Sequence, residues 1–234
     1  MKIDNAVALV TGGNRGIGLA FAQALLARGA RKVYVGARDP AAVTLAGVHA
    51  LRLDVTDAAQ VAAAAAQAAD VDLVINNAGV AQPGGFLAAD SEEVARRMFE
   101  TNVFGVLRVS KAFAPVLKAN GGGALLNVLS VGSWLNGGEL AAYSASKAAA
   151  WSLTNALRAE LAPQKTLVVG LHMAYVDTDL TRGLDVPKTS PQDIVQRALD
   201  GLEAGAEEVL ADPLTAQVRQ GLGAVRPSYL PQRA

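Results

Sequence analysis

The chain has 234 residues, 21 basic and 21 acidic side chains, two histidines and no cysteine. The balanced charge removes the electrostatic argument for a nucleic-acid or anionic-membrane binder, and the lack of cysteine excludes disulfides and thiolate chemistry. His49 and His172 lie far apart in the sequence, so no multi-histidine metal site is expected. Hydrophobic residues make up 51%, and no apolar run has the length of a signal peptide or a membrane span. We therefore expect one globular, cytoplasmic domain over residues 1–234.

Short runs rich in Val, Ile and Leu alternate along the chain with longer segments of helical spacing. Strands are expected at Ala6–Val10, Lys32–Gly36, Val48–Leu53, Leu73–Asn76, Ala124–Leu129, Thr166–Leu171 and Glu207–Leu210. Helices are expected at Ile17–Arg28, Ala58–Ala69, Glu92–Leu117, Ala141–Leu161 and Pro191–Leu202. Strands that are apolar on both faces and alternate with helices predict a doubly wound, Rossmann-type α/β fold. Its seven-stranded sheet should be mainly parallel, with helices on both faces.

A glycine-rich turn follows the first expected strand and opens the first expected helix. Its residues are Thr11, Gly12, Gly13, Asn14, Arg15, Gly16, Ile17 and Gly18. Such a turn lets backbone N–H groups approach a pyrophosphate, and a side chain at Gly16 would block that approach. A glycine motif alone could be only a tight turn, but its place between a strand and a helix predicts dinucleotide binding.

The end of the second expected strand bears on the choice of dinucleotide. An acidic residue at this strand end binds a ribose 2′-hydroxyl, whereas an arginine accommodates a 2′-phosphate. Arg38 occupies this position, and Arg15 in the glycine turn could bind the same phosphate. These arginines favour NADP(H), although both could be solvated surface residues and the adjacent Asp39 is a signal for NAD(H).

Tyr143 and Lys147 are four residues apart, so a helix would place them on one face. A neighbouring ammonium should lower the pKa of the Tyr143 phenol and fit it for proton transfer to a carbonyl oxygen. Ser130 ends an expected strand, and its hydroxyl could hydrogen-bond the same oxygen. A Tyr/Lys pair alone also occurs by chance on ordinary helices.

Five motifs occur together in order and spacing that resemble the short-chain dehydrogenase/reductase family, over roughly residues 5–180. They comprise the glycine turn, Asp54-Val55, Asn76-Asn77-Ala78-Gly79, Asn102, and Ser130 with Tyr143 and Lys147. The resemblance implies that Tyr143 is the general acid/base and that Asn102 kinks a helix and holds a proton-relay water. It implies a catalytic set of Asn102, Ser130, Tyr143 and Lys147. The implied cofactor-binding set is Thr11, Gly12, Asn14, Arg15, Gly16, Ile17, Gly18, Arg38, Asp54, Val55, Asn76, Ala78, Gly79, Tyr143, Lys147, Val176 and Thr178.

The expected substrate pocket is largely apolar and suits a hydrophobic or bulky ketone. Its candidate residues are Ser130, Val131, Ser133, Trp134, Leu135, Leu140, Met173, Tyr175, Leu180 and Leu184. Trp134 could instead anchor a surface loop. Arg182 could contact an acidic group, but a solvated position is the simpler expectation.

Four features depart from the family pattern, one of which is the short stretch of 15 residues between Arg38 and Asp54. Met173 and Ala174 replace its usual Pro-Gly pair, the segment between Thr178 and Pro191 leaves room for only a short lid, and the tail over 212–234 is atypical. The resemblance also implies a homo-oligomer formed through the helices Glu92–Leu117 and Ala141–Leu161.

The sequence thus predicts an NADPH-dependent carbonyl reductase or alcohol dehydrogenase that interconverts a ketone or aldehyde and an alcohol by hydride transfer, without a metal. An NAD-linked secondary-alcohol dehydrogenase is the first alternative. A non-catalytic dinucleotide-binding regulator is the second, and it would be expected to have lost Tyr143 or Lys147.

Overall fold

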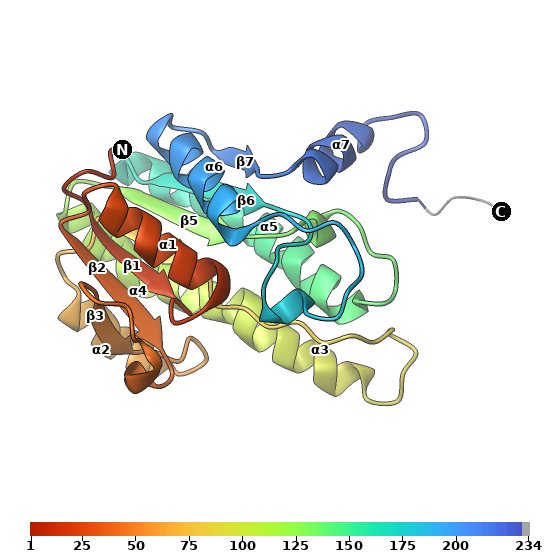
Figure 1. Cartoon of the computed structure of the whole chain (residues 1–234), viewed down its shortest axis with the longest axis horizontal. Helices are drawn as coiled ribbons and strands as arrows, with labels where there is room; N and C mark the ends of the chain where they lie inside the picture. Colours follow the sequence, from red (N-terminus) through yellow and green to blue (C-terminus); the bar gives the residue numbers. More distant parts are fainter. Residues whose placement is uncertain (231–234) are drawn as a thin grey trace.

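The computed structural model describes residues 1–230, whose seven parallel strands form one sheet in the order β3-β2-β1-β4-β5-β6-β7 (Figure 1). The strands are β1 (Val7–Thr11), β2 (Lys32–Ala37), β3 (His49–Arg52), β4 (Leu73–Asn76), β5 (Ala124–Val128), β6 (Leu167–His172) and β7 (Glu208–Leu210). The helices are α1 (Gly16–Ala27), α2 (Ala58–Gln67), α3 (Ser91–Phe99), α4 (Val106–Ala119), α5 (Ala141–Leu161), α6 (Pro191–Glu203) and α7 (Pro213–Gly221). The predicted Rossmann-type α/β fold is confirmed.

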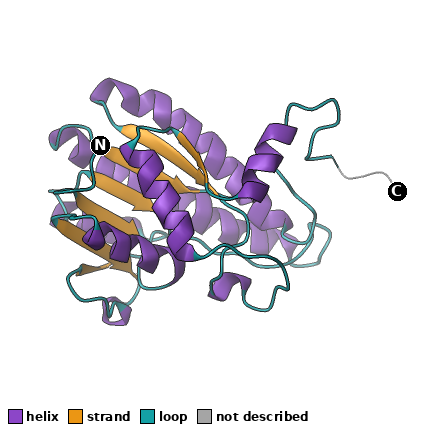
Figure 2. Cartoon of the chain, turned by 45° about the horizontal axis from the view of Figure 1, so that its top comes forward, coloured by secondary structure: helices purple, strands orange, loops and turns teal. Residues whose placement is uncertain are grey.

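Each face of the sheet carries its own apolar core, because successive side chains of a strand point to opposite faces. In β1, Ala8 and Val10 belong to the core that includes residues of α1 and α6. Val7 and Leu9 belong to the core that includes residues of α2, α4 and α5. Helices therefore cover both faces of the sheet, as Figure 2 shows.

The predicted helix Glu92–Leu117 is not continuous. It divides into α3 and α4, which are joined by a π-helical turn over Glu100–Gly105. Gly105 lies against Val55 so closely that an added Cβ would be 2.7 Å from the Val55 Cγ2 atom. This turn contains Asn102, the residue expected to kink the helix, and π-helical turns are frequent at functional sites.

The helix α7 was not among the predicted elements, although its start carries recognisable signals. The Asp212 side chain accepts a hydrogen bond from the Thr215 N–H, and Pro213 occupies the first helical turn. The part of the atypical tail beyond residue 230 lies outside the described residues. No helix within residues 1–230 is long and apolar enough to cross a membrane.

Candidate active site

The predicted site residues gather at the carboxyl ends of the central strands. The chain runs from β1 outward to β2 and β3, then returns to pair β4 with the other side of β1. Such a reversal opens a crevice at the carboxyl ends of the strands, where ligands of open α/β sheets bind. The glycine turn follows β1, and Ser130 follows β5.

The backbone of the glycine turn is shaped to leave space at the start of α1. Gly12 and Gly16 have positive φ angles of 64° and 55°, a conformation that other residues rarely adopt. A Cβ added to Gly18 would lie 2.3 Å from the Gly12 carbonyl oxygen, so the close packing there requires glycine. A Cβ on Gly16 would meet only Thr178, at 3.6 Å from its methyl group. The space between Gly16 and Thr178, beside the first N–H groups of α1, fits the pyrophosphate of a dinucleotide.

Asn77 holds this turn in place, a role that the sequence analysis did not assign. Its side-chain amide donates hydrogen bonds to the carbonyl oxygens of Thr11, at 2.9 Å, and Gly12, at 3.2 Å. The Thr11 hydroxyl in turn accepts the N–H groups of Asn77 and Ala78, each at 3.0 Å. Asn77 is the second residue of the Asn76-Asn77-Ala78-Gly79 motif, and this motif is the sequence signal that points to it.

The Asn76 side chain is directed into the fold and not toward the crevice. It is buried and donates to the Asn127 Oδ1 atom at 2.9 Å and to the Ser110 hydroxyl at 3.3 Å. The Asn127 side-chain amide extends this network by donating to the Thr154 hydroxyl at 2.9 Å. The Asn76 side chain therefore joins β4 to β5, and a contact of this residue with the cofactor would be made by its backbone.

The adenosine end of the crevice carries exposed charges. Arg38 is exposed where β2 ends, and Arg15 is paired with Asp179 at 3.4 Å with both side chains largely in solvent. The Asp39 carboxylate accepts the Ala41 N–H at 3.0 Å and so caps the short 3₁₀ turn that follows β2.

Asp54 and Val55 follow β3 at the same end of the crevice. The Asp54 carboxylate accepts the Thr56 N–H at 2.9 Å and the Thr56 hydroxyl at 2.7 Å. Val55 is buried against Gly105 of the π-helical turn. The backbone of the two expected adenine-contacting residues is therefore fixed.

The four expected catalytic residues meet beside β5. The Ser130 hydroxyl lies close enough to Tyr143 to lower the pKa of the phenol, and it accepts the Gly132 N–H at 3.0 Å. The Lys147 ammonium donates to the Val128 carbonyl oxygen at 2.8 Å and lies 5.8 Å from the centre of the Tyr143 ring. The Asn102 amide donates to the Ser146 hydroxyl at 2.9 Å, and Ser146 donates to the Tyr143 carbonyl oxygen at 2.6 Å.

Asn102 also fixes the chain that follows β4. Its Oδ1 atom accepts the Val80 N–H and its Nδ2 atom donates to the Val80 carbonyl oxygen, both at 2.9 Å. A Cβ added to Gly79 would be 3.3 Å from the Asn102 Oδ1 atom and 3.7 Å from the Lys147 Nζ atom. Gly79 therefore lies directly against two of the catalytic side chains.

Burial controls the protonation of the catalytic pair. It lowers the pKa of Lys147 to about 8, because no charge compensates the desolvated ammonium. Burial also raises the pKa of Tyr143, against the lowering effect of the neighbouring Ser130 hydroxyl. The expected depression of the Tyr143 pKa by Lys147 is therefore wrong for this structure: the ammonium bonds to a backbone carbonyl and not to the phenol.

Two of the expected substrate-pocket residues are enclosed by other parts of the protein. Met173 is 4% exposed and belongs to the apolar core that includes α1 and α6. Trp134 is 9% exposed, and its ring stacks on His172 with centroids 4.0 Å apart. Their assignment to the pocket is corrected: residues after β6, together with α6, enclose Met173, and the Trp134 ring is occupied by aromatic partners.

Ser130 and Ser133 are buried as well, and most of the remaining expected pocket residues are more accessible. Leu135 and Leu140 are half-buried, and Tyr175, Leu180 and Leu184 are exposed. The last two lie on the short lid, whose ends are held together by a bridge between Val176 and Thr189. At this bridge the Asp177 N–H donates to the Thr189 carbonyl oxygen and the Thr189 N–H to the Tyr175 carbonyl oxygen, both at 2.9 Å.

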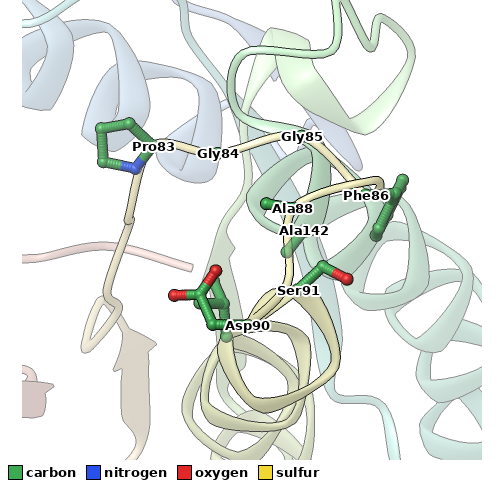
Figure 3. Close-up of a pocket in the computed structure, with 9 residues that line it drawn as sticks. Pro83, Gly84, Gly85, Phe86, Ala88, Asp90, Ser91 and Ala142 are labelled. Atoms are coloured by element: carbon green, nitrogen blue, oxygen red, sulfur yellow. The ribbon is translucent and has the colours of Figure 1, made fainter.

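The loop after β4 lies against the start of α5. The Gly84 N–H donates to the Glu139 carbonyl oxygen at 2.8 Å, and the Ala141 N–H donates to the Gly84 carbonyl oxygen at 3.2 Å. A small cavity beneath this loop is lined by Pro83, Gly84, Gly85, Phe86, Ala88, Asp90, Ser91, Val94 and Ala142 (Figure 3). None of the catalytic residues lines it, so it is separate from the active site. Within the described residues, no group of three or more His, Asp or Glu side chains is placed to hold a metal ion.

Comparison with known proteins agrees with this geometry. The short chain dehydrogenase family model matches residues 6–188, and the chain belongs to that family. Among curated relatives, the galactitol 2-dehydrogenase (L-tagatose-forming) of Cereibacter sphaeroides is 39% identical over 191 residues, which are 77% of this chain and 75% of the relative. The 3-oxoacyl-[acyl-carrier-protein] reductase FabG of Escherichia coli (strain K12) is 30% identical over 218 residues, 89% of this chain and 88% of the relative.

Two solved structures extend the comparison. A short chain dehydrogenase from Burkholderia cenocepacia J2315 in complex with NADP is 42% identical, with a TM-score of 0.93 over 97% of this chain and 96% of that chain. A short chain dehydrogenase/reductase from Burkholderia phymatum in complex with NAD is 25% identical, with a TM-score of 0.86 over 100% and 99%. The chain is therefore an oxidoreductase of this family.

Proposed function

We propose that this protein is an NADPH-dependent carbonyl reductase that converts a ketone or aldehyde to an alcohol, and the alcohol back when conditions favour oxidation. The observation that carries the proposal is the meeting of Ser130, Tyr143 and Lys147 at the carboxyl end of β5, beside the glycine turn. A complete catalytic cluster of this kind weighs against a purely regulatory dinucleotide-binding protein.

The protein's own residues supply the proton in this reaction. The nicotinamide, when bound, supplies the hydride to the carbonyl carbon. Tyr143 gives its phenolic proton to the carbonyl oxygen, while the Ser130 hydroxyl donates a hydrogen bond to the same oxygen. The Lys147 ammonium stabilises the phenolate that remains. Because burial raises the pKa of Tyr143, the phenol is protonated at neutral pH, which suits reduction better than oxidation.

The charges at the adenosine end favour NADP(H) over NAD(H). Arg38 is exposed at the end of β2, where a 2′-phosphate would lie, and Arg15 projects from the glycine turn. The Asp39 carboxylate is engaged by the Ala41 N–H and is less free to accept a ribose hydroxyl. The similar Burkholderia cenocepacia protein bound to NADP supports the same choice. An NAD-linked secondary-alcohol dehydrogenase remains the second candidate, supported by the NAD complex of the Burkholderia phymatum protein.

The side chains near the short lid favour an uncharged, hydrophobic or bulky substrate. Tyr175, Leu180 and Leu184 are exposed near the short lid. Arg182, one of the two cations of this segment, is paired with Asp179. A polyol, as in the name of the galactitol relative, would need more hydrogen-bonding groups than these side chains offer.

The test is turnover with a panel of carbonyl compounds, measured with NADPH and with NADH. We expect NADPH-driven reduction of bulky aryl or alkyl ketones, and weaker activity with a keto-sugar or an acyl-thioester. Preference for NADH would support the second candidate. Cofactor binding without reduction or oxidation of any compound in the panel would contradict the proposal and favour a regulator.

We further propose that the chain acts as one catalytic domain and forms a homo-oligomer through α4 and α5. Phe104, in the π-helical turn before α4, is 47% exposed, which is consistent with an apolar contact to a second copy. Light scattering at micromolar protein should give the mass of a dimer or tetramer. The mass of a single chain would contradict this assembly.

A further inference from the structure

His172 lies at the end of β6, fully buried behind the catalytic serine. Its Nδ1 atom is 3.2 Å from the Ser130 carbonyl oxygen. A carbonyl oxygen only accepts hydrogen bonds, so this contact requires the proton to be on Nδ1. The neutral ring then has a fixed tautomer, with an N–H group directed at the backbone of Ser130.

Aromatic contacts hold the imidazole in this orientation. The Trp134 ring stacks on it at 4.0 Å with an interplanar angle of 17°, and Trp151 meets Trp134 edge-on at 6.0 Å. The Arg219 guanidinium lies over the Trp134 ring, 5.7 Å from its centre. Since Arg219 belongs to α7, the C-terminal helix contributes to this stack.

Charged groups complete the surroundings of the ring. The Glu208 carboxylate lies 3.6 Å from the His172 Nε2 atom and is itself paired with Arg219 at 3.0 Å. Burial lowers the pKa of His172 to about 4; Ser130 and Glu208 oppose this, and Arg219 and Lys147 add to it. The ring is therefore neutral at physiological pH, which keeps its tautomer constant.

The backbone on either side of Ser130 is bound to β6 and its continuation. The Leu129 N–H donates to the Leu171 carbonyl oxygen and the Val131 N–H to the Met173 carbonyl oxygen, both at 2.8 Å. The imidazole holds the carbonyl group of Ser130 itself, between these two bonds. The serine hydroxyl, which lowers the pKa of Tyr143, projects from this backbone.

We propose that His172 is a positioning residue for Ser130, acting through its Nδ1–H group on the serine carbonyl and held in turn by Trp134 and α7. This role rests on the proposed function, because it concerns the hydroxyl that orients the substrate. It also assigns a purpose to the start of the atypical tail, because α7 supplies Arg219, which lies over the stack and is paired with Glu208 of β7.

Two substitutions separate positioning from packing. His172→Phe keeps a ring against Trp134 but removes the N–H group, whereas His172→Asn keeps an N–H donor near the position of Nδ1. We expect the Phe variant to lose at least about tenfold in kcat for ketone reduction, and the Asn variant to retain kcat within about threefold of the native value. The dissociation constant for NADPH, measured by cofactor fluorescence, should be unchanged in both.

The pH profile gives a readout that a packing defect would not move. The Ser130 hydroxyl lowers the pKa of Tyr143, so displacement of this hydroxyl should move the pH profile of alcohol oxidation to higher pH in the Phe variant. The Asn variant should keep the native profile. Thr166→Val is the control: it removes a buried hydrogen bond to the Gly122 carbonyl oxygen, at the opposite end of β6. It should leave kcat and the pH profile unchanged.

If His172→Phe does not fold, the comparison of His172→Asn with His172→Gln replaces it, because Gln presents its N–H group near Nε2 instead. Native kcat and a native pH profile in the Phe variant, or equal activity of the Asn and Gln variants, would overturn the positioning role alone. Absence of any turnover in the native protein would refute the proposed function and this role together.

Discussion

At the catalytic end of the crevice, Asn102, Ser130 and Lys147 are buried and hydrogen-bonded, whereas at the adenosine end Arg15 and Arg38 are exposed. The difference follows from what each end must do. Proton transfer needs groups held in a fixed geometry in a dry environment. Recognition of a phosphate needs only mobile positive charges that settle around it when it arrives. Substitutions at the two ends should therefore fail in different ways.

The largest effect is expected at the catalytic end. Tyr143→Phe should lower kcat by about a thousandfold or more, because the phenolic proton is the one transferred to the substrate. The dissociation constant for NADPH should stay close to the native value. Steady-state kinetics and a fluorescence titration test the two statements. Retention of more than about a tenth of kcat, a barrier change below about 1.4 kcal/mol, would contradict the assignment.

At the adenosine end, Arg38→Asp should change the preferred cofactor and leave the chemistry intact. The ratio of kcat/KM for NADPH over NADH should fall by about 10- to 100-fold, because a phosphate partner is replaced by a hydroxyl acceptor. Asp39→Asn is the matched control, since asparagine can still accept the Ala41 N–H. An unchanged ratio in Arg38→Asp would place the phosphate elsewhere.

Lys147→Met tests how much the buried charge lowers the stability of the folded protein. Folding lowers the pKa of this lysine from 10.5 to about 8, so the protonated form opposes folding below about pH 8. At 1.36 kcal/mol per pKa unit, and allowing about 1 kcal/mol for the lost bond to Val128, the inactive variant should be more stable by about 2 kcal/mol at pH 7. This gain in stability should shrink between about pH 8 and pH 10.5. Chemical denaturation of the native protein and of the variant at these two pH values tests this. A variant less stable than the native protein at pH 7 would disprove this cost.

The smallest effect is expected from Asp179→Asn. Asp179 pairs with Arg15 across the crevice, and exposed ion pairs are weak. Its removal frees Arg15, so NADPH should bind about two- to fivefold more tightly at low salt, with little difference at high salt. Asp177→Asn, on the same exposed segment, should have less effect. Weaker binding in Asp179→Asn would mean that Asp179 supports the cofactor site.

The sequence predicted best those features that depend on local patterns. The glycine turn, the seven strands and the pairing of Tyr143 with Lys147 follow from residue type and spacing, and the structure contains all of them. Side-chain surroundings created by distant segments could not be read in the same way. Trp134 is covered from α7, and the N-cap carboxylate of that helix accepts the Ala174 N–H next to Met173, at 2.8 Å. Because α7 was not predicted, the burial of side chains by this helix could not be predicted either.

The protonation of Tyr143 shows a second limit. The spacing of Tyr143 and Lys147 correctly indicated proximity, and proximity suggested a lowered phenol pKa. The depth of burial, which opposes that effect, depends on the packing of α5 against the rest of the chain. Sequence spacing describes one helix face and carries no measure of desolvation.

The bridge between Val176 and Thr189 has a consequence for how substrate range can change. Because the two ends of the lid are already held together, added residues extend only the loop beyond them. Doubling the length of such a loop costs only about 0.6 kcal/mol in closure entropy. Insertions between these ends are therefore a cheap route, in evolution or in the laboratory, to a new specificity on an unaltered catalytic centre.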